Sequence, residues 1–364
     1  MSQPSPWAGP SRPPVWGPPP PGPAYAPYAP YAPYAPLPPV LPGSPGGPGG
    51  PGGPGGPTKR WKLPVVLVSV ALVVAAIPVG IMLLRPAGGP SVTGPLPGGN
   101  QSNPYTPGPP DTAPDTMPTQ DNWNDIDQLL LENPLYGKTP AVVDCGVGDL
   151  DVARAGAAEV EDYLNQLVLC LMYAWYPPVT RAGFELPRPP VVVYTEPVTT
   201  PCGQFDMGVA YYCSADQQVY YALDLPRVYP AAWRTMRFLS PAFITHEFGH
   251  VVQYRTGILL GSAAYQDSWE ASGNHATALT FSRRMELQAT CLAGMSFAAM
   301  AASTAMSDQD KQDVLTIFSS IGDAQPGAGE HGTPESSRHW YEAGFGAKTV
   351  AECNTFAADA KDVE

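Results

Sequence analysis

The sequence predicts an α+β fold, because strand-like segments are grouped between helical segments in the second half of this chain of 364 residues. The stretch 152–175 has apolar residues at steps of three or four, which is typical of a helix with a buried face. The run PVVVYT at 190–195 is typical of a buried strand. The first half contains two segments whose composition does not suit a globular core.

Residues 1–58 form the first of these segments. The first 57 residues hold 22 of the 48 prolines and no Asp or Glu, with a Tyr-Ala-Pro repeat at 25–36 followed by Gly-Gly-Pro triplets. Too few branched apolar residues are present to bury a core, so we expect a disordered tail with polyproline II character in the repeat. The alternative is a docking strip for a proline-recognising partner or for self-association.

The second segment, 63–84, has 22 residues without a formal charge. A helix of that length spans ~33 Å, enough to cross a bilayer. Three basic residues precede it and only Arg85 follows closely, which favours a cytoplasmic N-terminus and an extracytoplasmic remainder. We therefore expect 59–85 to be a single-pass signal anchor in the cell membrane. A cleaved signal peptide is the alternative, but the run is long and no clean Ala-x-Ala site follows.

The part beyond Arg85 is strongly acidic. It contains 14 basic and all 32 acidic residues, so its formal charge is −18. This charge argues against nucleic acid as a partner and is compatible with neutral or basic peptides. Residues 86–120 are rich in Pro, Gly, Ser, Thr and Asn and predict a flexible extracytoplasmic linker. One folded domain is expected over 121–356, followed by a C-terminal tail at 357–364.

All six cysteines lie in the acidic part, which favours disulfides in an exported protein. Six cysteines allow 15 pairings. We favour Cys202–Cys213, which flank a short loop before a hairpin, and Cys291–Cys353, which would tie the C-terminal segment to a central helix. Cys145–Cys170 then remains. No C-x-x-C spacing supports a metal role for these residues.

Further strands and helices follow within the domain. Segments 210–212 and 219–222 predict two strands joined by a polar turn at 214–218. Ser240-Pro241 predicts a helix start, with serine as the cap, and the helix should end before Gly257. The remaining segments are a loop containing Gly261, Ser262, Gly273 and Asn274, an Ala-rich helix at 276–303, a helix at 308–319, and a last helix that begins at Thr333-Pro334.

The most informative motif is His246-Glu247-Phe248-Gly249-His250, which lies in the helix expected after Ser240. Histidines four residues apart lie on one helix face, because one turn takes 3.6 residues. Their imidazoles can hold one zinc ion, with Glu247 directed at the water that the metal activates.

A catalytic zinc site usually has three protein ligands, so a third must come from elsewhere. Glu286 is the candidate, because a carboxylate on an apolar, Ala-rich helix is costly to bury unless it is paired. The competing reading is a solvated glutamate beside Arg283 and Arg284. His275 is a rival ligand, but its Gly-Asn-His context is typical of a loop.

These motifs extend into a longer resemblance. The segments HEFGHVVQ, ELQATCLAG, HGTPESSRHWYEAGF and CNTF resemble the bacterial neutral zinc metallopeptidase family over roughly 142–356. The resemblance implies a zincin-like, gluzincin-type domain, in which His246, His250 and Glu286 bind Zn²⁺ and Glu247 is the general base. One position differs: the family has Asp four residues after the zinc-binding Glu, where this chain has Thr290.

The function predicted from these observations is hydrolysis of peptide bonds by a membrane-anchored, extracytoplasmic zinc metallopeptidase. His331 is the candidate donor to the tetrahedral oxyanion, with Tyr341 and His339 as rivals. A peptide or protein substrate could bind along the 191–194 strand or the 211–221 hairpin by β-augmentation. The alternative is a weakly active or inactive metal-binding scaffold whose Pro-rich tail recruits partners.

Overall fold

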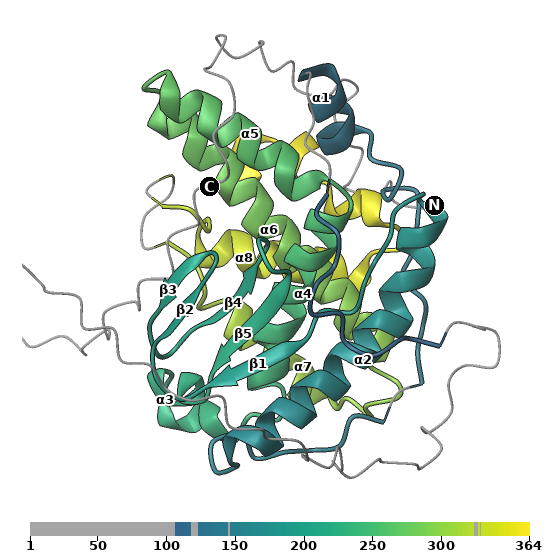
Figure 1. Cartoon of the computed structure of the whole chain (residues 1–364), viewed down its shortest axis with the longest axis vertical. Helices are drawn as coiled ribbons and strands as arrows, with labels where there is room; N and C mark the ends of the chain where they lie inside the picture. The colour runs from purple at the N-terminus through teal and green to yellow at the C-terminus, as the bar shows by residue number, and fades with distance from the viewer. Residues whose placement is uncertain (1–105, 118–122, 145, 324–326, 328) are drawn as a thin grey trace, which may run out of the picture. The chain divides into compact units, whose positions relative to one another are not determined.

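A small mixed sheet lies beside the helix that carries the His-Glu-x-x-His motif (Figure 1). The computed structural model describes residues 106–117, 123–144, 146–323, 327 and 329–364. The predictions for the tail at 1–58 and the anchor at 59–85 therefore lie outside the described residues. No helix within the described ranges is long and apolar enough to cross a membrane.

The sheet has the strand order β1-β5-β4, with β1 at Val191–Tyr194, β4 at Ala210–Cys213 and β5 at Gln218–Ala222. β5 is parallel to β1 and antiparallel to β4, and Tyr220 is opposite both Val192 and Tyr211. The three predicted strands are confirmed. Their order makes β4 an edge of the sheet, and this edge faces the motif helix.

A second, two-stranded sheet was not expected from the sequence. β2 (Val198–Thr200) and β3 (Gly203–Phe205) form an antiparallel pair. The Cys202–Cys213 disulfide joins the turn of this pair to the end of β4 and confirms the first predicted pairing. The small sheet is thereby fixed to the edge strand.

Eight α-helices occur within the described residues. They are α1 Trp123–Leu131, α2 Ala157–Arg181, α3 Leu225–Val228, α4 Leu239–Arg255, α5 Ile258–Ala271, α6 His275–Met300, α7 Asp308–Phe318 and α8 Pro334–Gly346. α2 packs against β1 and α4 against β4, while α6 packs against α4, α5 and α8. The predicted α+β class is confirmed, and α6 is the central helix of the helical part.

The helix expected at 152–175 was misplaced at both ends. α2 begins at Ala157 and continues through Pro177 and Pro178 to Arg181. Proline has no N–H, so Pro178 leaves the carbonyl of Ala174 without its usual helical donor. The N–H of Ala141 donates to that carbonyl at 2.9 Å. A contact from outside the helix therefore replaces the lost bond, which local sequence could not reveal.

Ser240 does not cap the motif helix. α4 begins at Leu239 with Phe238 in the cap position, and no side chain caps it. The Ser240 hydroxyl lies 2.6 Å from the Tyr221 hydroxyl of β5. The hydroxyl predicted to cap the helix is therefore used in a tertiary hydrogen bond to the sheet.

The expected loop after the motif helix is mostly a helix, α5. Gly257, at φ +79, turns the chain into it, and Gly261 packs against Leu130 and Ile126 of α1, where a Cβ would already be within 3.3–3.4 Å. Gly273 ends α5 with φ +79, and Asn274 caps α6 by accepting from the N–H of Thr277. The packing of α5 on α1 therefore outweighs the local preference of its glycine and serine residues for a loop.

The helices α4 and α6 approach closely at Gly249. A Cβ at this position would lie 2.9 Å from the carbonyl oxygen of Ala289 on α6. Only glycine allows this approach, and Gly249 lies between the two motif histidines.

The same kind of contact joins α6 to α8, where Gly344 lies against the Cys291 carbonyl beside the Cys291–Cys353 disulfide. This disulfide confirms the second predicted pairing. The third involves Cys145, which lies outside the described residues.

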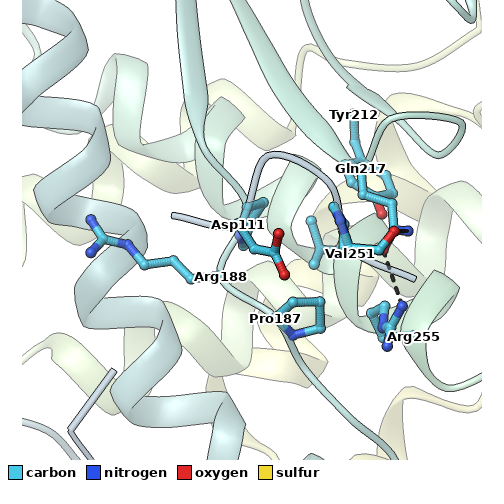
Figure 2. Close-up of a pocket in the computed structure, with 9 residues that line it drawn as sticks. Asp111, Pro187, Arg188, Tyr212, Gln217, Val251 and Arg255 are labelled. Carbon is cyan, nitrogen blue, oxygen red and sulfur yellow. Dashed lines mark hydrogen bonds between the residues drawn. The ribbon is translucent and has the colours of Figure 1, made fainter. Parts of the chain in front are cut away.

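Both flanks of the expected domain pack against it where they are described. Residues 106–117, from the predicted linker, lie over α4 and the β4–β5 turn: Arg255 donates to the Asp115 carbonyl at 2.7 Å, and Gln217 donates to the same carbonyl at 3.1 Å. Figure 2 shows the small pocket beneath this segment, between Asp111, Val251 and Arg255. In the segment 357–364, the Asp362 carbonyl accepts from the indole of Trp340.

We predict that Gly249→Ala weakens both the fold and metal binding. Overpacking costs about 1–3 kcal/mol, against a gain of about 1 kcal/mol in helix propensity. The free energy of unfolding, from urea titration of metal-free protein, should fall, and zinc affinity should fall with it. Gly346→Ala is the control, because a Cβ added at this position would have no atom within 4 Å. Equal stability of the Gly249 variant and wild type would contradict the close approach.

Candidate metal centre

The two motif histidines and Glu286 meet between α4 and α6. His246 Nε2 lies 3.1 Å and His250 Nε2 lies 3.4 Å from the same oxygen, Glu286 Oε2. The three ligand atoms all lie within 4.8 Å of one another, and all three residues are buried. This is the convergence predicted from the motif and from the carboxylate on the Ala-rich helix.

The spacing and chemistry of these atoms fit a zinc ion. Ligands of tetrahedral zinc lie about 2.0–2.1 Å from the metal, which places them roughly 3.3 Å from each other. The two nitrogen–oxygen distances, 3.1 and 3.4 Å, bracket that value. Two imidazoles and one carboxylate also form a ligand set that catalytic zinc uses, with one coordination position left for water or substrate.

The rival ligand His275 is not part of this group. It is the first residue of α6, its side chain is 71% exposed, and it pairs with Glu270 of α5. Glu286 lies eleven residues further along α6, which is about 16 Å at 1.5 Å per residue. The expectation that His275 lies in a loop was wrong, but its exclusion from the metal cluster agrees with the geometry.

Charge coupling between the ligands is strong. Burial raises the pKa of the Glu286 carboxyl, but the charge of His250 and hydrogen bonds from both imidazoles outweigh it and hold this pKa well below its usual range. Burial lowers the pKa of His250, but Glu286 outweighs burial and raises this pKa to about 9. The pKa of His246 is lowered, chiefly by burial. Without metal, a proton on His250 therefore compensates the charge of Glu286 at neutral pH.

Glu247 lies between the ligand cluster and the sheet. Its Oε2 accepts a hydrogen bond of 2.8 Å from the backbone N–H of Tyr212 on β4. Burial raises the pKa of the Glu247 carboxyl to about 7, against the opposing effect of His250. A carboxyl with this pKa can exchange a proton near neutral pH, as a general base requires.

Each ligand histidine has a polar partner on its other ring nitrogen. Thr290 Oγ1 lies 3.2 Å from His246 Nδ1, so the position where the family has Asp does contact a ligand histidine. Gln253 Oε1 lies 2.8 Å from His250 Nδ1. Gln253 was not recognised as a functional residue in the sequence. Its place three residues after His250, on the same helix, was the available signal.

Of the three candidate oxyanion donors, His331 is the one coupled to the ligand cluster. Its Nδ1 lies 3.7 Å from Asp323 Oδ1, and its backbone N–H donates to Asp323 Oδ2 at 2.8 Å. Burial lowers the pKa of His331, but Asp323 and Glu286 outweigh it, so this pKa is raised. Asp323, which holds His331, was also not recognised in the sequence.

The two rival donors lie on α8, whereas His331 lies in the loop before this helix. Tyr341 is buried among the rings of Phe297, Phe318 and Phe345, and burial raises the pKa of its hydroxyl. His339 is half-buried on α8, and its ring lies edge-on to that of Trp340.

The site geometry defines a candidate zinc centre, with two histidines from α4 and a glutamate from α6. The chain belongs to the family described as "Putative neutral zinc metallopeptidase", whose model matches residues 151–356, more than half of the chain. The resemblance seen in the sequence is confirmed. Zinc is the metal of this family, and the His246, His250 and Glu286 cluster can bind it.

Similar curated proteins occur in Escherichia coli and in mycobacteria. The uncharacterized protein YpfJ of Escherichia coli (strain K12) is 30% identical over 195 residues, which cover 50% of this chain and 66% of that relative. The uncharacterized proteins Mb2605 of Mycobacterium bovis and Rv2575 of Mycobacterium tuberculosis (strain ATCC 25618 / H37Rv) are each 28% identical over 243 residues, covering 58% of this chain and 76% of the relative. No solved structure matches the chain significantly.

Zinc affinity should depend on pH, because zinc must displace the proton on His250. The raised pKa, about 9, means that this proton is present in the metal-free protein below pH 9 and must leave on binding. Affinity should rise about tenfold per unit between pH 7 and 8.5 and level off above pH 9. Chelator competition measures the slope, and calorimetry in buffers of different ionisation enthalpy should count about one proton released per zinc. A flat profile would contradict the proposed coupling.

Proposed function

We propose that this chain is a zinc-dependent peptidase that hydrolyses peptide bonds in peptide or protein substrates. The observation that carries the proposal is the convergence of His246, His250 and Glu286 within 4.8 Å, with the Glu247 carboxylate beside them. Membership of the zinc metallopeptidase family supports the same reaction class.

The role of Glu247 is to move one proton. Zinc, when bound, would lower the pKa of water and polarise the substrate carbonyl. Glu247 accepts a proton from the attacking water at a carboxylate oxygen and delivers it to the amine nitrogen as the C–N bond breaks. One water molecule is consumed: its hydroxide becomes part of the new carboxyl group, and its proton goes to the new amine. A pKa raised by burial suits both halves of this role.

His331 is proposed to donate a hydrogen bond to the oxyanion that develops on the carbonyl. Its pairing with Asp323 and its raised pKa keep the imidazole protonated to higher pH than an exposed histidine, so that a donor is present. Donors aimed at developing charge in a buried site are among the largest contributions to catalysis. Asp323 would hold the ring in place rather than touch the substrate.

The substrate is proposed to bind along the outer edge of β4. Ala222 N–H donates to the Val209 carbonyl, and this register turns the N–H of Tyr212 away from β5 toward Glu247. A peptide added along this edge by β-augmentation would place its carbonyls next to the general base. Of the two strands considered from the sequence, β4 is therefore favoured over β1.

The proposed setting is the outer face of the cell membrane, with the anchor at 59–85 and the N-terminus in the cytoplasm. The run of 22 uncharged residues and the basic residues before it support this orientation. The two disulfides between described residues are in keeping with an oxidising compartment. The tail at 1–58 is proposed as a flexible segment that can recruit a proline-recognising partner.

A second candidate is a metal-binding scaffold with little or no turnover. The observation that favours it is Thr290, whose neutral hydroxyl contacts His246 where the family has Asp. Loss of an outer partner typically costs about 10- to 100-fold in metal affinity or activity.

Replacing Glu247 by Gln should separate the two candidates. Glu247→Gln should still bind about one zinc per chain, because Glu247 is not a ligand, while cleavage of unstructured peptides should fall by roughly 10²–10⁴-fold. Zinc content and peptide turnover are measured side by side on purified protein, with Glu159→Gln, an exposed change on α2, as the control. Zinc-loaded wild type without turnover on a broad peptide library would favour the scaffold. Full turnover in Glu247→Gln would refute the assigned base.

A further inference from the structure

Two fully buried glutamines connect the metal ligand His250 to the interior of the domain. Gln253 Oε1 lies 2.8 Å from His250 Nδ1. The amide nitrogen of Gln253 donates to the Met285 carbonyl at 2.8 Å and to Gln288 Oε1 at 3.0 Å. Both glutamines are 0% exposed, so water cannot replace either partner.

The chain of hydrogen bonds continues from Gln288 to the backbone. Its amide nitrogen donates to the Cys353 carbonyl at 3.1 Å and to the Tyr136 hydroxyl at 3.3 Å. The Tyr136 hydroxyl in turn donates to the Leu130 carbonyl at 2.8 Å. Cys353 is held in place by its disulfide to Cys291 on α6. The chain therefore ends on backbone carbonyls, which can only accept.

Those carbonyls set the direction of every bond in the chain. The Gln288 amide must turn its N–H₂ toward them, which leaves Gln288 Oε1 facing Gln253. The N–H₂ of Gln253 must then face Gln288 Oε1 and the Met285 carbonyl, which leaves Gln253 Oε1 facing the imidazole. Within the described part of the chain, Gln253 Oε1 contacts His250 Nδ1, and it can accept a hydrogen bond there only if Nδ1 carries a proton.

From this geometry we propose that Gln253, anchored by Gln288, is a positioning residue that fixes the tautomer and ring orientation of His250 for zinc. With the proton held on Nδ1, the lone pair of the neutral ring lies on Nε2, which is the atom beside Glu286 Oε2. A neutral imidazole with a free lone pair is the form that binds a metal. The inference rests on the proposed metal site, but it does not require that the site turns over substrate.

The other ligand histidine is held differently. Thr290 contacts His246 Nδ1 through a hydroxyl, which can rotate to donate or to accept. This contact alone does not select a tautomer, whereas the amide chain behind His250 does. The two histidines of one motif are thus predicted to differ in how rigidly they are prepared for the metal.

The test compares Gln253→Met, which keeps the volume but removes the acceptor, with Gln253→Glu, which keeps an acceptor for Nδ1–H. Zinc affinity is measured by chelator competition at fixed pH. Gln253→Met should weaken zinc binding about 10- to 100-fold. Gln253→Glu should lose less affinity than Gln253→Met, because a protonated carboxyl can donate its O–H to Gln288 Oε1 or the Met285 carbonyl and still accept from His250 Nδ1–H.

A second readout reports the hydrogen bond of the Nδ1–H directly. In long-range ¹H–¹⁵N spectra of zinc-loaded protein, the Nδ1–H of His250 should be visible and slow to exchange in wild type and Gln253→Glu. It should exchange rapidly in Gln253→Met. Gln312→Met, an exposed change on α7, is the matched control and should alter neither reading.

The outcomes separate a positioning role from a merely structural one. Equal zinc affinity in wild type and Gln253→Met would overturn the proposal, as would equal losses in the Met and Glu variants. If Gln253→Met does not fold, as judged by circular dichroism, Gln288→Met gives the answer. That change leaves Gln253 in place without its anchor and should still weaken zinc binding several-fold. Zinc binding that follows these predictions without peptide cleavage would sustain this proposal and count against the proposed function.

Discussion

The structure depends on one buried carboxylate. Glu286 is 5% exposed on the central helix, and an ionised carboxylate at such a depth is costly unless positive charge compensates it. In the metal-free protein the compensation comes from the proton on His250, and in the metal-bound protein it would come from the cation. The depressed pKa of Glu286 and the raised pKa of His250 are two aspects of this single constraint.

Much of the surrounding architecture brings that carboxylate to the two imidazoles and keeps it there. Gly249 lets α4 and α6 approach at the level of the motif. The edge strand β4 supplies the N–H that holds Glu247, and the Cys202–Cys213 disulfide fixes the end of that strand. Behind His250, Gln253 and Gln288 form a chain of hydrogen bonds that ends at the carbonyl of the disulfide-linked Cys353. Rigid support of this kind is what a preorganised metal site requires.

The site could be predicted from the sequence to the extent that its chemistry is local. The spacing of His246 and His250 follows from one helical turn, and Glu286 was conspicuous as an acid on an apolar helix. Gln253 and Gln288 were missed because their role depends on Cys353, which lies 65 residues beyond Gln288 in the chain.

The fold, like the site, was predictable where it depends on local sequence and not where it depends on distant contacts. The strands at 191–194, 210–213 and 218–222 follow local pattern, whereas α5 forms because Gly261 packs on α1, and Ser240 fails as a cap because Tyr221 of β5 takes its hydroxyl.

The most direct test of the central claim is X-ray absorption spectroscopy of the zinc-loaded domain, in wild type and in Glu286→Ala. The account predicts a first shell of nitrogen and oxygen at about 2.0–2.1 Å with the scattering signature of two imidazoles and no sulfur. It also predicts a marked loss of bound zinc in Glu286→Ala. Sulfur in the first shell, or a wild-type spectrum and zinc content in Glu286→Ala, would contradict it.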